Sequence, residues 1–182
     1  MNFQNTKNTF KLVLSVGDES GIGPEITLKA LSSNEIPENI DFILVGSKKN
    51  LQNTYKKLRS LGIENLANPK NYKIHDLELS SSNDESKSSY GNSSFYYLTK
   101  AIEIVKQYPN SAIVTGPICK KSWSLAGHHF SGQTEVLAKL CGVKNVGMLF
   151  TAKSPITGWR FNTLLATTHI SLREVPKQLM HY

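Results

Sequence analysis

The stretch KLVLSVGDESGIGPEITLKAL, residues 11–31, decides the fold of this chain. It begins with an apolar run, Leu12–Val16, that suits a strand covered on both faces. An acidic, glycine-rich turn follows this run. A helix is then predicted to start at Pro24, because a proline at the first helical position loses no hydrogen bond. A strand, a tight turn and a helix in this order are typical of an α/β fold.

The turn itself is a candidate anion or cofactor site. Gly21 and Gly23 can adopt backbone angles that other residues avoid, and a helix N-terminus directs free N–H groups toward a phosphate or carboxylate. A dinucleotide fingerprint read from Gly21 would need glycine at position 26, where the chain has Ile26, so that fingerprint is excluded. Many α/β proteins carry such a turn and bind nothing there, so a purely architectural turn stays an alternative.

Length and composition bound the class of protein. The chain has 182 residues, enough for one sizeable core, and a net charge of +7 from 21 basic and 14 acidic side chains. The lysines are scattered without a basic, aromatic-interleaved stripe, so we expect no nucleic-acid partner. Cys119 and Cys141 lie far apart without metal-binding spacing, which fits a reducing compartment. With no run of about 18 apolar residues, we expect a cytoplasmic protein without a membrane partner.

A second strand and helix follow the first pair. Ile40–Gly46 is predicted as a buried strand, and residues 50–61 as a helix with apolar side chains at helical spacing. This order implies a parallel sheet with right-handed crossovers. Residues 80–92 are polar and predict an exposed loop, after which residues 93–108 predict a helix with one apolar face.

The later part of the chain first repeats the order of strand, turn and helix and then contains two consecutive strands. Residues 111–117 predict a strand and turn, and residues 135–140 predict a short helix. Strands predicted at 146–151 and 162–168 are joined by a short turn, which would mix antiparallel pairing into the sheet. A capped helix is predicted to begin at Ser171. The chain stops soon afterwards, so we expect the front portion of a longer protein.

Two loops that follow predicted strands carry candidate binding residues. Lys120 can pair with a phosphate or carboxylate as a mobile charge, and Gln133 and Thr134 offer neutral donors beside a helix start. Such loops lie at the carboxyl ends of strands, where open α/β sheets bind ligands. The alternative is that Thr134 only caps a helix and Lys120 is a surface lysine.

Histidine supplies one candidate metal ligand. A hydrophobic strand ends at His169, whose ring could ligate a divalent metal if two or more further ligands were near, or could instead be buried or cap a helix. His128 and His129 are adjacent and cannot share one face, so they make a weak metal pair. The remaining histidines and both tryptophans are interpreted as structural or surface residues: His75, His181, Trp123 and Trp159.

Four separated motifs, taken together, resemble one known family, the 4-hydroxythreonine-4-phosphate dehydrogenases of pyridoxal phosphate biosynthesis. The motifs keep their order and spacing across nearly the whole chain, and they are Gly17–Glu25, Thr115–Lys120, Phe130–Glu135, and Ala166–His169 followed by Leu172–Arg173. The resemblance identifies the chain as the N-terminal portion of such an enzyme.

The resemblance implies an α/β fold similar to the isocitrate and isopropylmalate dehydrogenases, a layered sheet with helices on both faces, truncated before its second half is complete. In this interpretation residues 1–10 are a flexible N-terminus. Residues 11–182 form the α/β dehydrogenase domain or domains only in part, because the C-terminal half is missing. It also implies a homodimer with the active site between subunits.

The implied reaction is NAD- or NADP-dependent oxidation of 4-(phosphooxy)-threonine to a 2-amino-3-oxo acid that decarboxylates. The resemblance implies a divalent metal, Zn, Mg or Co, bound by His169. The resemblance assigns Gln133 and Thr134 to the substrate, beside the Lys120 charge inferred above from the residues, while the turn with Gly21 and Gly23 borders the cofactor cleft. No catalytic residue is assigned.

Two departures from the family keep alternatives open. Gln133 stands where the family usually has histidine, and glutamine carries no positive charge. The family's other two metal histidines belong to the half that this chain lacks. The alternatives are a related decarboxylating dehydrogenase of an unphosphorylated hydroxythreonate or diol acid, and a non-catalytic truncated domain.

Overall fold

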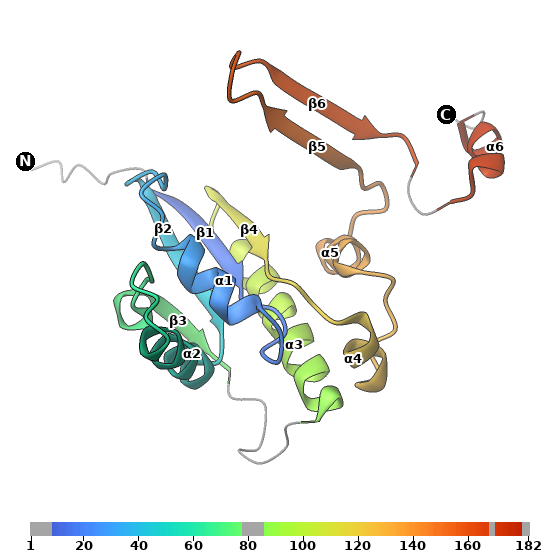
Figure 1. Ribbon diagram of the computed structural model, residues 1–182. Coiled ribbons are helices and arrows are strands. Elements are labelled where there is room, and N and C mark those ends of the chain that lie inside the picture. Colours follow the sequence, from blue (N-terminus) through green and yellow to red (C-terminus); the bar gives the residue numbers. More distant parts are fainter. Residues whose placement is uncertain (1–8, 78–85, 168–169, 180–182) are drawn as a thin grey trace, which may run out of the picture. The chain divides into compact units, whose positions relative to one another are not determined.

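The computed structural model describes residues 9–77, 86–167 and 170–179, and the chain divides into two compact units, Met1–Cys141 and Gly142–Tyr182. Figure 1 shows the elements of each unit. The first unit contains β1 (Phe10–Ser15), α1 (Gly23–Ala30), β2 (Ile40–Gly46), α2 (Lys48–Ser60), a 3-10 turn (Pro69–Asn71), β3 (Lys73–Asp76), α3 (Lys87–Val105), β4 (Ser111–Thr115), α4 (Lys120–Leu125) and α5 (Gln133–Cys141). The second contains β5 (Met148–Lys153), β6 (Arg160–Leu165), a 3-10 turn (Leu172–Glu174) and α6 (Val175–Leu179).

The first unit is built on a four-stranded parallel sheet in the order β3-β2-β1-β4. The register pairs Val13 of β1 with Ile43 of β2 and with Ile113 of β4. Because apolar residues run continuously through β1 and β2, both faces of these strands need a cover. The predicted parallel sheet is therefore confirmed, and it is central to the unit.

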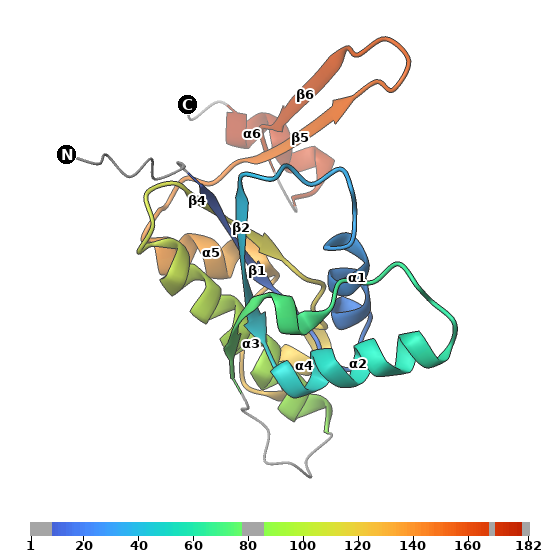
Figure 2. The ribbon, with the colours of Figure 1, turned by 90° about the vertical axis from the view of Figure 1, so that its left-hand side faces the viewer.

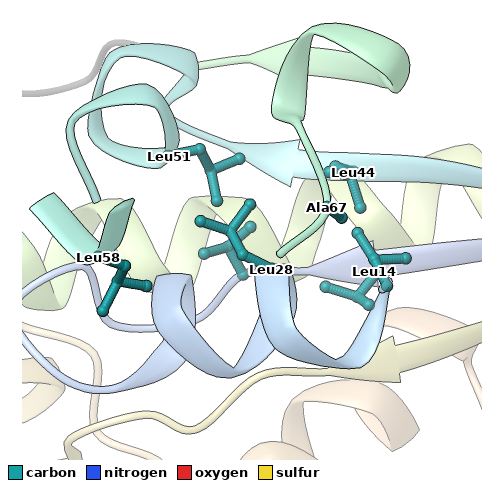
Figure 3. Packing of buried hydrophobic residues seen from close by; sticks show 8 residues of the cluster. Leu14, Leu28, Leu44, Leu51, Leu58 and Ala67 are labelled. Atoms are coloured by element: carbon teal, nitrogen blue, oxygen red, sulfur yellow. The ribbon is translucent and has the colours of Figure 1, made fainter. Parts of the chain in front are cut away.

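Helices cover both faces of this sheet, as Figure 2 shows for α1 and α2 on one side and α3 on the other. Successive side chains of a strand point to opposite faces. Leu14 and Leu44 accordingly pack with α1 and α2, whereas Val13 and Ile43 pack with Tyr97 of α3. The first of these two clusters is drawn in Figure 3, where Leu28 of α1 lies among the other leucines. Leu28 is 0% exposed and belongs to the core.

A third cluster joins α3 to α4 and α5. Its centre is Trp123 of α4, which is 0% exposed and donates a hydrogen bond from Nε1 to Ser94 Oγ at 2.8 Å. Phe95 meets the Trp123 ring edge-on, with ring centroids 5.4 Å apart. Gly91 allows this contact, because a Cβ there would lie 2.0 Å from Ser122 O. The structural interpretation of Trp123 is thus confirmed.

The start of α3 corrects one prediction. The loop predicted over residues 80–92 extends too far, because α3 begins at Lys87. Ser86 caps this helix by accepting a hydrogen bond from the Ser89 N–H at 3.1 Å. The first turns of α3 are polar because small residues allow α4 to approach closely, so apolar periodicity did not reveal them.

The second unit is an antiparallel hairpin followed by short helical turns. β5 pairs with β6 from Met148 opposite Leu165 to Lys153 opposite Arg160. The predicted hairpin is confirmed, but the prediction that it would add antiparallel pairing to the parallel sheet is wrong, since β5 and β6 form a sheet of two strands. Many of its apolar side chains are exposed, including Trp159 at 64%.

A helical turn is confirmed where a capped helix was predicted to begin at Ser171. Leu172–Glu174 forms a 3-10 turn that continues into α6. Among the described residues, no helix combines the length and the apolar character that crossing a membrane requires.

Candidate functional site

The predicted site residues of the first unit lie near the carboxyl edge of the parallel sheet. β1 stands between β2 and β4, so the chain order changes direction at the boundary between β1 and β4. Open α/β sheets bind ligands outside such a switch point, between the loops that follow the two strands. Here those loops are the β1–α1 turn, residues 16–22, and the segment after β4, residues 116–119.

Main-chain contacts join these two loops directly. Gly116 N donates to Ser15 O at 2.7 Å, and Asp18 N donates to Pro117 O at 2.9 Å. Gly17 has a φ of +83°, and a Cβ there would lie 2.3 Å from Pro117 O. The boundary between β1 and β4 is therefore filled by backbone, and a ligand has to bind outside it.

The β1–α1 turn satisfies most of its own polar groups. Asp18 is 6% exposed, and its Oδ1 accepts hydrogen bonds from Ser20 N at 2.9 Å and Ser20 Oγ at 2.7 Å. Gly21 N donates to Asp18 O at 3.2 Å. Gly21 is exposed at the surface of the turn, where a ligand can reach it.

Gly23 has a different place from Gly21. It is buried at the first position of α1, and a Cβ there would lie 2.2 Å from Val16 O. Glycine at this position lets α1 begin against the end of β1. Close packing of helix on strand accounts for Gly23, whereas its predicted contact with a cofactor stays a prediction.

Gln133, at the start of α5, is tied to the segment after β4. Its Nε2 donates to Gly116 O at 2.9 Å, which fixes the orientation of the amide. Its Oε1 is buried and has no hydrogen-bond partner among the described residues. A buried acceptor without a donor is costly. This oxygen can accept a hydrogen bond from a hydroxyl, an ammonium group or a water molecule.

Lys120 and Thr134, the other two predicted substrate-binding residues, lie at the starts of α4 and α5. Lys120 is the first residue of α4, and a Cβ at Gly132 would lie 3.9 Å from its Nζ. The structure thus brings the lysine ammonium beside the residue that precedes Gln133. Thr134 is the second residue of α5, inside the first turn and not at the position before the helix where a capping side chain sits.

The adjacent histidines His128 and His129 contact different residues. His128 stacks on Phe95 with ring centroids 3.8 Å apart, and its Nε2 lies 2.9 Å from Asn92 Oδ1. His129 is exposed, with Nδ1 3.4 Å from Ser124 Oγ. Burial lowers the pKa of His128, and His129 lowers it further.

No metal centre is formed by the residues that the structure describes, since they contain no group of three His, Cys, Asp or Glu side chains that could hold an ion. His169 and His181 lie outside the described residues. His75 lies on β3, where burial first, and then the charges of Lys73 and Lys100, lower its pKa. The described part of the chain therefore does not by itself fit a divalent metal.

Sequence reasoning missed three ionisable groups near this edge. Hydrogen bonds from the Ser122 hydroxyl and amide lower the pKa of the Cys119 thiol at the start of α4. Glu19, in the β1–α1 turn, and Tyr97, on α3, hydrogen-bond to each other. No local pattern signals this pair, because 78 residues separate its members.

The fold and the edge just described define a class of protein, an α/β protein with a parallel sheet covered by helices on both faces. The profile of the family described as pyridoxal phosphate biosynthetic protein PdxA matches residues 38–181. The chain belongs to this family, and the recognition made from the four motifs is confirmed.

Curated relatives support the same family. A 4-hydroxythreonine-4-phosphate dehydrogenase from Synechococcus sp. is 46% identical over 171 residues, covering 93% of this chain and 51% of the relative. A protein of the same name from Nostoc sp. is 44% identical over 176 residues, covering 93% of this chain and 49% of the relative. The chain spans about half the length of the curated relatives it matches.

Solved structures support the fold. The crystal structure of a 4-hydroxythreonine-4-phosphate dehydrogenase from Burkholderia phymatum has a TM-score of 0.74 at 22% identity, covering 93% of this chain and 53% of that one. That of the Klebsiella pneumoniae enzyme of the same name has a TM-score of 0.72 at 22% identity, covering 95% and 54%. At this identity the likeness concerns the fold alone.

Proposed function

We propose that this chain forms about half of an NAD- or NADP-dependent dehydrogenase that oxidises 4-(phosphooxy)-threonine in pyridoxal phosphate biosynthesis. The observation that carries the proposal is membership of the family over residues 38–181. The names of the relatives, 4-hydroxythreonine-4-phosphate dehydrogenase, supply the substrate and the reaction type.

The chain's own residues would bind the substrate at the carboxyl edge of the sheet. Lys120 supplies a positive charge for a phosphate or carboxylate, and Thr134 supplies a hydroxyl. The bond from Gln133 Nε2 to Gly116 O supports a fixed amide whose Oε1 accepts a hydrogen bond from the substrate hydroxyl or ammonium group. In this arrangement Gln133 orients the substrate without adding charge.

The remaining chemistry needs groups that the described residues do not provide. A bound nicotinamide would supply the hydride acceptor for oxidation of the alcohol, and a base that is not assigned to a residue of this chain would take the hydroxyl proton. The resulting 3-oxo acid would then lose carbon dioxide. We infer that His169 is one ligand of a divalent metal and that further ligands come from outside this chain, because one histidine cannot hold the ion alone. Gly21 is exposed and can border the nicotinamide cleft.

We further infer that the complete enzyme is a homodimer with the layered fold of the isocitrate and isopropylmalate dehydrogenases. Exposed apolar side chains on the β5–β6 hairpin support a surface that another chain or the rest of the enzyme covers, including Leu149 at 60%, Phe150 at 53% and Leu164 at 67%. Residues 11–182 would then be partial α/β dehydrogenase domain.

The test is turnover of phosphorylated and unphosphorylated 4-hydroxythreonine, with NAD or NADP, by a complete enzyme that carries this chain as its N-terminal portion. Faster turnover of the phosphorylated substrate supports the proposal, and preference for an unphosphorylated hydroxy acid would redirect it. Calorimetric titration of the purified chain with the phosphorylated substrate then decides whether the chain alone keeps a binding site. Lys120→Met should weaken that binding, while Lys121→Met, its neighbour, serves as the matched control. Absence of both turnover and binding would favour a non-catalytic domain.

A further inference from the structure

The Tyr97 hydroxyl lies between two oxygen acceptors. It is within hydrogen-bond distance of Glu19 Oε1 in the β1–α1 turn, and it lies 3.2 Å from the carbonyl oxygen of Leu77, just after β3. The Ser93 hydroxyl, one turn earlier on α3, also bonds to the Tyr97 oxygen. Tyr97 is 1% exposed, so water does not readily replace any of these partners.

A count of protons decides the state of this cluster. A tyrosine hydroxyl has one proton to donate and two lone pairs that accept. If Glu19 were ionised, the Tyr97 proton could serve only the carboxylate or the Leu77 carbonyl, and the other acceptor would face an oxygen without a proton. If Glu19 carries a proton, it donates to Tyr97, Tyr97 donates to Leu77, and every group is paired.

The surroundings of Glu19 favour the same state. Burial raises the pKa of Glu19 above its usual 4.5, and the charges of Asp18 in its own turn and Asp76 at the end of β3 raise it further. Hydrogen bonds from Tyr97 and from the Ser47 amide at the start of α2 oppose this shift. Burial, the largest cause, also raises the pKa of Tyr97, so this residue keeps its single proton.

We propose that Glu19 is a neutral carboxylic acid that donates a hydrogen bond to Tyr97. With this proton in place, the bonds from Glu19 to Tyr97 and from Tyr97 to Leu77 O connect the β1–α1 turn to α3 and to the end of β3. Loss of the proton leaves a charge among acidic neighbours and an unpaired acceptor. The turn then loses one of its attachments. This proposal does not depend on the proposed enzymatic function.

The direction of the pH effect follows from linkage. Because the folded chain holds the proton more tightly than the unfolded chain, the stabilisation is fully present below the unfolded pKa and is lost as pH rises through the folded pKa. Between these two values the unfolding equilibrium constant rises by up to about tenfold per pH unit. Glu19→Gln keeps a donor toward Tyr97 without an ionisable proton, so this variant should lack that loss.

The experiment combines infrared spectroscopy with urea denaturation of the full chain, from about pH 5 to about pH 9, a range that brackets a raised carboxyl pKa. We expect a protonated carboxyl C=O band at neutral pH that is lost in Glu19→Gln and kept in Glu25→Gln. Glu25 is a matched control because its carboxylate pairs with Lys29 at 2.5 Å on the surface of α1. We also expect Glu19→Gln to have a higher urea midpoint than the native chain at the alkaline end.

Two results would overturn the proposal. One is a native spectrum at neutral pH without a protonated carboxyl band. The other is a Glu19→Gln variant whose urea midpoints parallel those of the native chain at every pH. If Glu19→Gln does not fold, the native chain still decides the question, because the proposed band must disappear as pH rises.

Discussion

Alanine in place of Gly23 tests whether this glycine is present for packing. Gly23 opens α1 against the end of β1, and a Cβ there would lie 2.2 Å from Val16 O, whereas real contacts of this kind stay beyond 3.0 Å. The obstacle is the backbone oxygen of Val16, directly after β1, and it cannot rotate away as a side chain could. The first turn of α1 therefore has to shift by about 0.8 Å, and Leu28, 0% exposed, moves with it.

The size of the effect follows from two opposing contributions. Forcing extra volume into a packed site costs about 1–3 kcal/mol, and a rigid backbone obstacle places Gly23→Ala near the upper value. Alanine recovers up to about 1 kcal/mol because it restricts the unfolded chain and favours the helix. The free energy of unfolding should therefore fall by about 2 kcal/mol. With a urea m-value near 2 kcal/mol/M, the midpoint should fall by about 1 M.

Urea denaturation followed by circular dichroism measures this change. The matched control is Gly21→Ala in the same turn, where a Cβ would lie 3.5 Å from its nearest neighbour, Asp18 O, an ordinary contact. This control should stay within about 0.5 kcal/mol of the native chain. The packing argument is refuted if Gly23→Ala is as stable as Gly21→Ala.

Three further perturbations have definite expected outcomes. Leu28→Ala should lower the free energy of unfolding by about 2–5 kcal/mol through a core cavity, while Leu61→Ala, at a position 67% exposed, should change it by less than about 0.5 kcal/mol in the same urea assay. Trp123→Phe should cost about 1–3 kcal/mol, since it removes the indole hydrogen bond and leaves a gap; a native-like thermal midpoint would contradict this. In a complete enzyme that carries this chain, His169→Ala should weaken Zn²⁺ binding in calorimetric titration by at least about 10–100-fold, the loss typical of outer-shell partners, whereas His75→Ala should leave it unchanged. Equal losses in both histidine variants would argue against a ligand role.

The central strands could be predicted because their pattern is local. The apolar runs of β1 and β2 need cover on both faces, and the prediction for β2 matches the observed Ile40–Gly46. The start of α1 was predicted at Pro24 and lies at Gly23, since proline fits the first helical turn. For each of these elements, the residues that predict it lie within about seven consecutive positions.

Two elements escaped prediction because their signal is not local. β3 is four residues long at the edge of the sheet, none of its residues is buried, and it is a strand because it pairs with β2. α4 has six residues and depends on one anchor, Trp123, which packs against α3. A short element with at most one large buried apolar side chain has no hydrophobic periodicity from which it could be predicted.

The candidate site likewise has some features that local sequence indicates and others that only tertiary contacts determine. The rule that ligands bind at carboxyl ends of parallel strands grouped Lys120 with the segment that leads to Gln133, and the Lys120 ammonium does lie near Gly132. A binding role for these residues stays a prediction. The rule could not separate Gly21 from Gly23, because only the packing of α1 on β1 distinguishes the exposed glycine from the buried one. The Glu19–Tyr97 pair depends on tertiary contact alone.

The two tryptophans give each compact unit its own optical reporter. Trp123 is enclosed in the first unit at 0% exposed, whereas Trp159, directly before β6 in the second unit, is 64% exposed. An enclosed indole emits at shorter wavelength and resists aqueous quenchers, while a wet one emits at longer wavelength and is quenched readily. Iodide quenching of the intact chain can therefore follow the hairpin while leaving the signal of the parallel-sheet unit largely unchanged.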